Sequence, residues 1–245
     1  MKRLAAVPLH QQVRELITEH LSEISLPDDN RLPSESALAL RLGVSRATIR
    51  ETLLAMEREG LVTKRQGVGT FIHPSAVRAG PRIETIVDFG QMIRTAGYAR
   101  AALTSRTHNE AASADHAAPL GISAGDELHV LERTYWADDQ PAIFCVIRFP
   151  LKLVKDQSAW VTPDSIYNTV KRACGLEITH RIAWFKARIT GPEVAEALRL
   201  PIGQAIFSWD EVMYDLNDRP VLHAEIYFNT ALVPLCTLGK IEPKM

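Results

Sequence analysis

The sequence predicts an α+β fold in two parts: a helical N-terminal domain that ends in a β-hairpin, and a larger domain with an antiparallel sheet. Three observations support this prediction. Apolar residues recur at helical spacing as far as Glu59. A glycine-containing strand pattern follows over residues 61–72, and two longer hairpin patterns lie at residues 128–149 and 206–228. Two similar hairpins can pair into one antiparallel sheet with helices covering a face, so the second part is expected to be a mixed α/β domain.

The N-terminal domain begins with three predicted helices. The first covers residues 9–24 and ends before a Pro-Asp-Asp-Asn stretch. The second starts after Ser34, a favourable N-cap, and ends near Gly43, because glycine accepts the left-handed conformation common after a helix. The third opens at Ser45, another favourable N-cap, and runs to Glu59.

The order of these elements is that of a winged helix-turn-helix. Helix, short helix, tight turn, capped helix and hairpin follow one another within the first 72 residues. A small helical bundle with exposed arginines explains the helical periodicity equally well. The hairpin directly after the third helix favours DNA binding, with the start of the third helix in the major groove.

The candidate DNA-contacting residues lie at two helix starts and around the hairpin tip. Hydroxyls and helix N-termini suit phosphate oxygens, arginine can read guanine or grip phosphate, and glycine permits close backbone approach. The candidates are Ser34, Ser45, Arg46, Thr48, Arg50, Lys64, Gln66 and Gly67. Arg46 and Arg50 are four residues apart and share one face of the helix, although a solvated surface charge is the alternative for each. Turn chemistry is the alternative in the hairpin, and it is favoured for Gly69.

Charge and composition agree with a division into two domains. The chain has 245 residues, with 28 basic and 29 acidic side chains. Residues 1–78 hold eleven basic and nine acidic residues, whereas residues 79–245 hold seventeen and twenty. A net charge of −1 excludes binding to polyanions through bulk charge alone. The Pro-, Gly- and Ala-rich residues 74–82 are the predicted linker between domains 1–73 and 83–245.

Several classes of protein lack support in the sequence. Cys145, Cys174 and Cys236 have neither zinc-site nor disulfide-framework spacing, so a cytoplasmic location is expected. No apolar run approaches about 20 residues, and the N-terminus has no signal-peptide pattern, so no membrane partner is expected. The eight histidines show no metal-binding spacing, and there is no P-loop or Gly-x-Ser-x-Gly motif. The sequence therefore predicts no enzyme activity, metal or cofactor.

The second domain contains a weak internal repeat. Gly125 and Gly203 are 78 residues apart, and the turn residues Pro141 and Pro220 are 79 apart. In each copy a short helix precedes the glycine and a hairpin follows it. This period is too long for a solenoid. Two units that pair into one sheet explain the repeat, and coincidence between two ordinary hairpins is the alternative.

Four motifs in the first domain resemble those of the GntR superfamily of bacterial transcription regulators. They are Leu-Pro-Ser-Glu at 32–35, the stretch 42–51, Glu-Gly-Leu-Val at 59–62 and the stretch 66–71. The resemblance implies a DNA-binding regulator. Ser36 stands where many relatives have a DNA-contacting arginine, and Ala47 where many have threonine, so each departure weakens one contact that the resemblance implies and affects the expected operator preference.

The second domain resembles the UTRA domain, the effector-binding half of the HutC subfamily, which is similar in fold to chorismate lyase. The motifs are 131–135, 140–141 leading to 149–150, 165–167, and 219–221 with Tyr227. The resemblance implies a small-molecule effector. The candidate effector-binding residues are Arg133, Tyr135, Ser165, Tyr167, Glu225 and Tyr227.

Arg133 is the central candidate because a charged residue in an apolar strand needs a partner. Strand alternation places Tyr135 on the same face. The resemblance supplies a partner, an anionic or polar group of the effector, and the alternative is an ion pair with Glu225 or Glu211. Cys145 stands where relatives often carry glutamate, which predicts a less polyhydroxylated effector than a sugar.

The resemblance implies a ligand-responsive regulator, more often a repressor in this subfamily. A homodimer is expected to bind a pseudo-palindromic operator, with half-sites about 34 Å apart or set by the dimer geometry. Three alternatives remain: an enzyme with an appended DNA-binding module, a GntR protein with an all-helical and often metal-binding effector domain, and an architectural DNA-binding protein without a ligand.

Overall fold

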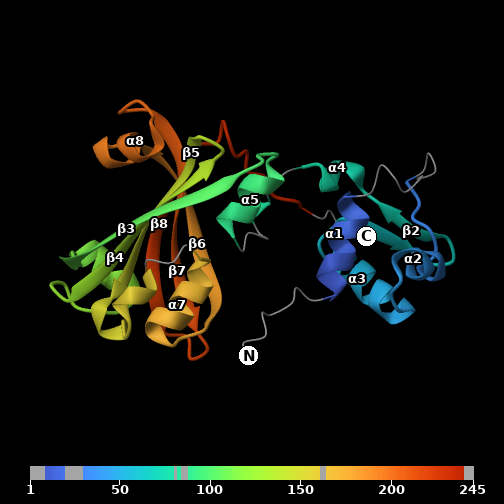
Figure 1. Ribbon diagram of the computed structural model, residues 1–245, viewed down its shortest axis with the longest axis horizontal. Coiled ribbons are helices and arrows are strands. Elements are labelled where there is room, and N and C mark those ends of the chain that lie inside the picture. The colour runs from blue at the N-terminus through green and yellow to red at the C-terminus, as the bar shows by residue number, and fades with distance from the viewer. Residues whose placement is uncertain (1–8, 20–29, 80–81, 84–87, 161–163, 240–245) are drawn as a thin grey trace, which may run out of the picture. The chain divides into compact units, whose positions relative to one another are not determined.

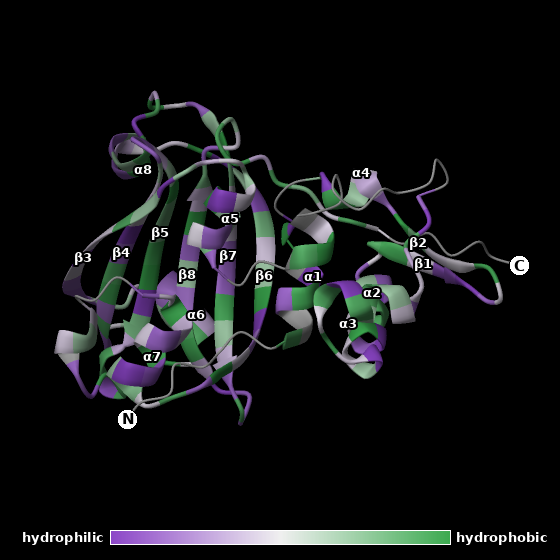
Figure 2. Cartoon of the chain, turned by 45° about the vertical axis from the view of Figure 1, so that its right-hand side comes forward, coloured by the Kyte–Doolittle hydropathy of each residue, from purple (hydrophilic) through white to green (hydrophobic). Residues whose placement is uncertain are grey.

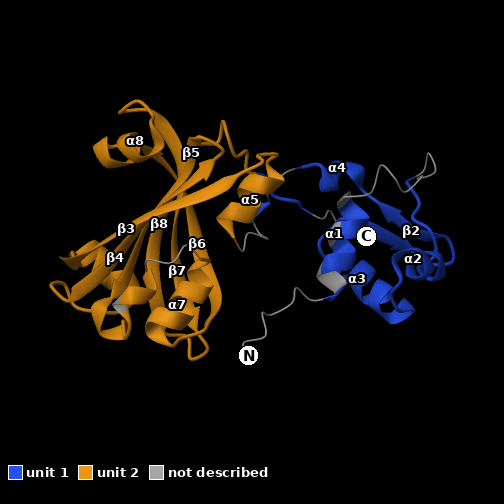
Figure 3. Ribbon diagram, viewed as in Figure 1, with its two compact units in different colours: residues 1–84, 236–245 blue, residues 85–235 orange. Residues whose placement is uncertain are grey.

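The computed structural model describes residues 9–19, 30–79, 82–83, 88–160 and 164–239. The chain divides into two compact units, which Figure 3 colours separately. Unit 1 comprises residues 1–84 and 236–245, and unit 2 comprises residues 85–235. Each unit is described by itself.

Unit 1 contains three helices followed by a hairpin, as the sequence predicts (Figure 1). Its elements are α1 (Leu9–Glu19), α2 (Glu35–Leu42), α3 (Arg46–Arg58), β1 (Val62–Arg65), β2 (Gly69–Ile72) and α4 (Pro74–Val77). Residues 20–24, predicted as the end of the first helix, lie outside the described residues. Ser34 and Ser45 cap α2 and α3, and Gly43 adopts the left-handed conformation with φ +66°. The helix-turn-helix and its hairpin are therefore confirmed.

One apolar core holds the elements of unit 1 together. The buried residues come from α1, α2, α3 and the hairpin, at the helical spacing that the sequence shows; they include Val13, Ile17, Leu38, Ile49, Leu53, Met56 and Ile72. Burial of such side chains stabilises the unit by about 1.5–3 kcal/mol each. The core packs α3 against α1, α2 and the first strand of the hairpin.

A C-terminal segment, residues 236–239, groups with unit 1 rather than with the second domain in which the sequence-based division placed it. The backbone N–H of Ile83 donates to the carbonyl of Cys236 at 2.9 Å. Leu238 packs against the core of unit 1, where a Cβ added to Gly60 would lie 3.2 Å from its Cδ2. The chain therefore returns to its N-terminal unit after completing unit 2.

Unit 2 is a six-stranded antiparallel sheet with the strand order β3-β4-β5-β8-β7-β6. The strands are β3 (Ala101–Ala111), β4 (Glu127–Ala137), β5 (Gln140–Pro150), β6 (Ile178–Ile189), β7 (Ala205–Asp215) and β8 (Pro220–Phe228). The hairpins β4–β5 and β7–β8 are those predicted from the sequence, and β5 pairs with β8 to join them. Both parts of the predicted α+β fold are therefore confirmed.

Helices cover both faces of the sheet. The helices of unit 2 are α5 (Phe89–Thr95), α6 (Ala114–Leu120), α7 (Ile166–Cys174) and α8 (Pro192–Leu198), with 3-10 turns at Leu151–Leu153 and Gln157–Trp160. Leu120 of α6 packs on Leu128, and Leu198 of α8 packs on Phe144, so α6 and α8 share one face. Phe89 of α5 contacts Tyr135 on the opposite face. Figure 2 shows hydrophobic residues recurring along these strands.

Candidate functional site

Hydroxyl side chains occupy the N-termini of both helices of the helix-turn-helix. The Oγ of Ser45 accepts the backbone N–H of Thr48 at 3.1 Å and lies 2.9 Å from the Thr48 Oγ1. The Oγ of Ser34 accepts the backbone N–H of Ala37 at 3.2 Å. The positive end of each helix dipole and these exposed hydroxyls form an environment that favours a phosphate group.

The two predicted arginines of α3 differ in their surroundings. Arg46 is the first residue of the helix and is exposed, with no hydrogen bond or ion pair to the described residues. Arg50 donates through Nε and Nη2 to Oε2 of Glu35, at 3.3 and 3.2 Å. Lys64 of the hairpin lies 3.3 Å from the other oxygen of Glu35. Arg46 is thus the freer group for a contact with a base.

Glu35 links the two helices and the hairpin of the candidate DNA interface. Partial burial alone would raise the pKa of this carboxyl, but Arg50 and Lys64 outweigh it and lower the pKa. Exposed ion pairs contribute only about 0–1 kcal/mol to stability. The pairs therefore mainly set the positions of Arg50 and Lys64, which is a role of Glu35 that the sequence pattern does not reveal.

The hairpin tip and the start of α2 line one surface groove. Four of the eight predicted DNA-contacting residues lie along it: Ser34, Lys64, Gln66 and Gly67. Gly67 has φ +73° with nothing within 4 Å of an added Cβ, so its backbone is open to close approach. Gly69 has φ +145°, and an added Cβ would lie 2.7 Å from Nε of Arg31. Any larger side chain at position 69 would meet both an unfavourable φ and the side chain of Arg31, so glycine has a structural role there.

Unit 2 contains a cavity of about 30 Å³ between the sheet and helices α5 and α7. Its polar lining residues are Asp88, Tyr135, Tyr167, Arg181 and Glu211. This volume accommodates about two water molecules. Tyr135 and Tyr167 are thus the predicted effector-binding residues that line the cavity.

The cavity wall includes an ion pair between Arg181 and Glu211, neither of which is among the candidate effector-binding residues. Nη1 of Arg181 donates to Oε2 of Glu211 at 2.8 Å. Burial raises the pKa of Glu211, and Arg181 opposes that rise only in part. Glu211 lies between the apolar residues Trp209 and Met213 on one face of β7, which is the strand pattern that could have identified it. Burial likewise raises the pKa of the Cys145 thiol, so this group is neutral in the cavity wall.

Arg133 is fully buried, at 0% exposure, and does not itself line this cavity, although its cross-strand neighbour Cys145 does. Its Nη1 donates to the carbonyl of Asp164 at 2.9 Å, and its Nη2 donates to Oγ1 of Thr169 at 3.0 Å. Its Nε has no hydrogen-bond partner, and no carboxylate of the described residues forms an ion pair with it. Ser165 caps α7 just beyond, and its Oγ accepts the backbone N–H of Asn168 at 3.3 Å. Arg133 and Ser165 therefore hold the start of α7.

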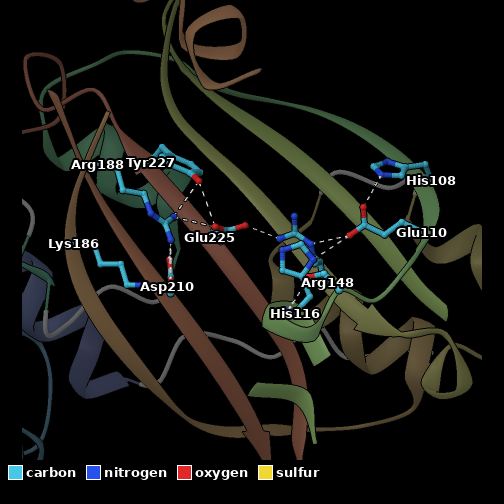
Figure 4. Close-up of polar contacts among 10 residues, drawn as sticks. His108, Glu110, His116, Arg148, Lys186, Arg188, Asp210, Glu225 and Tyr227 are labelled. Atoms are coloured by element: carbon cyan, nitrogen blue, oxygen red, sulfur yellow. Dashed lines mark hydrogen bonds and ion pairs between the residues drawn. The ribbon is translucent and has the colours of Figure 1, made fainter. Parts of the chain in front are cut away.

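Glu225 and Tyr227 lie on the other face of the sheet, away from the cavity that their neighbour Ile226 lines. Arg148 contacts Glu225 at 2.8 Å and Arg188 contacts it at 3.0 Å, as Figure 4 shows. Nη1 of Arg188 also donates to the Tyr227 hydroxyl at 3.0 Å. The structure therefore does not bring all six predicted effector-binding residues together.

A winged helix-turn-helix joined to a domain with a cavity that is mainly apolar but holds a few polar groups defines a class of DNA-binding regulators that carry a separate small-molecule domain. The model of bacterial regulatory proteins of the gntR family matches residues 9–72, and that of the UTRA domain matches residues 99–233. The chain therefore belongs to the GntR family of transcriptional regulators and carries the UTRA domain of its HutC subfamily.

Two curated relatives and one solved structure illustrate this similarity. The HTH-type transcriptional regulator YurK of Bacillus subtilis is 24% identical over 218 residues, 89% of each chain. The histidine utilization repressor of Pseudomonas putida is 32% identical over 122 residues, 49% of this chain and 48% of the relative. The crystal structure of the possible transcriptional regulator YydK from Bacillus subtilis has a TM-score of 0.68 at 17% identity, covering 94% of this chain and 99% of that one. This last likeness shows the fold alone.

The curated relatives are transcriptional regulators and not enzymes, which argues against the enzyme alternative. The six-stranded sheet of unit 2 excludes the alternative of an all-helical effector domain. Within the described ranges, no helix is long and apolar enough to cross a membrane. The same ranges hold no group of three or more His, Cys, Asp or Glu side chains placed to bind a metal ion.

Proposed function

We propose that the protein is a cytoplasmic repressor that binds a pseudo-palindromic operator as a homodimer, and that a small molecule in unit 2 controls its affinity for DNA. The relative from Pseudomonas putida, which is named as a repressor, supports the direction of control. For the DNA contacts, we propose Arg46 as the reader of a base. Arg50, Lys64 and the hydroxyls of Ser45 and Thr48 would hold phosphates.

The proposal of a small-molecule effector rests on Arg133, whose buried charge has no carboxylate partner among the described residues. A buried guanidinium without a carboxylate is costly, because removal from water is compensated only by neutral acceptors. An effector with a carboxylate or phosphate would supply the missing charge. The proposed site combines Arg133 with the cavity residues Tyr135, Tyr167, Arg181 and Glu211.

Phe89 links effector binding to the DNA-binding unit in this proposal. The cavity of about 30 Å³ is far smaller than the roughly 300 Å³ of ordinary ligand pockets, so an effector must displace a wall. The ring of Phe89 lies 5.4 Å from Tyr135 and 5.7 Å from Phe228. Its helix, α5, is the first described element of unit 2 after the connecting segment. Displacement of Phe89 would therefore act on the chain that leads to unit 1.

A direct experiment measures binding of the effector and of DNA together. Metabolites are screened by thermal shift against the full chain, because a ligand of the folded state raises its apparent stability. Each hit is then added to the protein with DNA selected from a random library, in a fluorescence-anisotropy titration. We expect an anionic hit to change DNA affinity by about 5–150-fold, the range of a coupling energy of about 1–3 kcal/mol.

A matched pair of arginine variants shows whether the effect comes from the cavity. Arg133→Met should abolish the thermal shift, whereas Arg100→Met should preserve it, because Arg100 pairs with the exposed Asp139 on the surface of unit 2. A hit that stabilises both variants equally, or leaves DNA affinity unchanged, refutes control through this cavity.

A further inference from the structure

Unit 2 is built from two equivalent halves. Strands β4 and β7 begin at residues 127 and 205, and helices α6 and α8 begin at residues 114 and 192, so the members of each pair are 78 residues apart. The strand order β3-β4-β5-β8-β7-β6 places one half on each side of a line between β5 and β8 (Figure 2). Residues that lie 78 positions apart on β4 and β7 therefore occupy equivalent places on the two sides of the sheet.

Arg133 and Glu211 are such a pair, and their charges are opposite. Arg133 lies on β4 and Glu211 on β7, and both are buried, at 0% and 3% exposure. Arg133 lies opposite Cys145 of β5, which lies opposite Ile226 of β8. Ile226 in turn lies opposite Trp209 of β7. Glu211 follows Trp209 by two residues, so it projects from the same face of the sheet as Arg133.

These two charges do not pair with each other. Strands β5 and β8 separate β4 from β7, so the two backbones lie about 14 Å apart. Among the described residues, the acceptors of Arg133 are neutral, and Glu211 is held by Arg181. Burial raises the pKa of the Cys145 thiol, the Glu211 carboxylate adds to that rise, and the Arg133 guanidinium opposes it. A neutral group of the cavity wall thus separates the two charges.

The charged residues that line the cavity are two carboxylates and one arginine, namely Asp88, Glu211 and Arg181. Arg181 pairs with Glu211 at 2.8 Å. Oδ1 of Asp88 accepts the backbone N–H of Gln91 at 2.7 Å as the N-cap of α5, and Asp88 has no ion pair with the described residues. The lining therefore has one negative charge in excess, whereas Arg133 beyond the wall has a positive charge without a carboxylate.

A ligand with one anionic group would satisfy Arg133 and leave the excess negative charge of the lining uncompensated. A cationic nitrogen at its other end would be attracted to the carboxylates of Asp88 and Glu211, and it would oppose the rise in the pKa of Glu211 that burial causes. The rings of Phe89 and Tyr167 also line the cavity, and aromatic faces attract cations. The charges of the site are therefore complementary to a molecule with one anionic and one cationic end.

We propose that the effector of unit 2 is a zwitterion of the amino-acid class, with its carboxylate at Arg133 and its cationic nitrogen at Asp88 and Glu211. The inference rests on the effector site proposed above and names the chemical class of its ligand. A zwitterion leaves neither the buried guanidinium nor the excess carboxylate without a partner. Because Arg133 and Glu211 come from strands about 14 Å apart, the distance between the two charges of the ligand contributes to specificity.

The first test compares matched ligands by isothermal titration calorimetry on the full chain. The probes are the standard amino acids and the ω-amino acids from glycine through γ-aminobutyrate to ε-aminocaproate, whose charged ends lie progressively farther apart. Each probe is compared with the carboxylic acid that lacks its nitrogen and with the amine that lacks its carboxylate. We expect at least one zwitterion to bind about 10–100-fold more tightly than both of its matched compounds, because each of these lacks one charge-assisted contact.

The second test replaces Asp88, because asparagine removes its charge and remains a favourable N-cap for α5. Asp88→Asn should weaken the binding of the zwitterion by at least about 10-fold and leave the binding of the matched carboxylic acid unchanged. Asp126→Asn is the matched control, since Oδ2 of the exposed Asp126 accepts the backbone N–H of Ser123 at 3.1 Å and Asp126 does not line the cavity. This control should bind both compounds as the wild type does. Thermal unfolding of each variant confirms that it is folded.

Two results would overturn the proposal. One is a panel in which no zwitterion binds more tightly than its matched carboxylic acid. The other is an equal effect of Asp88→Asn and Asp126→Asn on the binding of the zwitterion. If a carboxylic acid without nitrogen binds and controls DNA affinity, and Arg133→Met abolishes that binding, the effector site proposed above stands while the zwitterionic class fails.

Discussion

Replacement of Arg46 by alanine isolates the contribution of one side chain to DNA recognition. Arg46 is exposed and has no partner among the described residues, and alanine is favourable in a helix. The free energy of unfolding should therefore change by no more than about 0.5 kcal/mol. Any loss of DNA binding is then a loss of contact rather than of folded protein.

The size of the loss follows from the proposed contact and the proposed symmetry. A bidentate arginine–guanine pair contributes about 1–3 kcal/mol, so two copies in a dimer contribute about 2–6 kcal/mol. We therefore expect the operator dissociation constant to rise between about 30-fold and about 20,000-fold. If Arg46 only grips a phosphate, affinity falls evenly for all sequences and the salt dependence weakens by about one unit per copy.

Fluorescence anisotropy with selected and scrambled DNA at two salt concentrations separates these cases. Arg58→Ala is the matched control, because Arg58 is an exposed arginine in the last turn of the same helix. If Arg46→Ala and Arg58→Ala bind the selected DNA equally well, the start of α3 does not read the operator, and the reasoning fails.

Three further predictions concern both units. Arg133→Met should leave operator affinity unchanged in anisotropy assays but remove the thermal shift caused by an anionic effector; a retained shift contradicts the pocket. Gly69→Ala should lower the free energy of unfolding by about 1–3 kcal/mol, because of its φ of +145° and the nearby Arg31, whereas Gly67→Ala should cost about 1 kcal/mol. Equal losses in thermal unfolding would contradict this distinction. Glu225→Gln should destabilise the protein by about 1–3 kcal/mol at neutral pH. The pKa of Glu225 is lowered from 4.5 in the folded chain, so its stabilisation is present above that pH and lost as the pH falls through the folded value. Denaturant titrations should therefore show the difference from wild type shrinking below pH 4.5, and a constant difference would refute it.

Local signals in the sequence were sufficient for the starts of α2 and α3 and for the end of α2. Ser34 and Ser45 are N-caps because their hydroxyls satisfy free backbone donors, and Gly43 follows α2 because it tolerates a positive φ. Each of these preferences acts within four residues of the chain. The hairpins β4–β5 and β7–β8 are local in the same sense, because each turn joins neighbouring strands.

The composition of the cavity depends on contacts between distant residues, which local patterns do not reveal. Alternation places Glu225 and Tyr227 on one face of β8 but does not say which face α5 and α7 cover. Arg133 in an apolar strand indicates a need for a partner, yet its acceptors lie 31 and 36 residues away in sequence. Glu211 belongs to the cavity because the fold brings Arg181 to it across β6 and β7.

The return of residues 236–239 to unit 1 gives the molecule two covalent crossings between its units. A fragment ending near residue 84 would lack the Cys236 backbone partner of Ile83 and the Leu238 side chain that packs over Gly60. The smallest autonomous form of the DNA-binding unit is therefore discontinuous in sequence, and an excised N-terminal fragment should melt at a lower temperature than the same unit within the whole chain. A signal from unit 2 likewise has two routes along the backbone, one through each crossing.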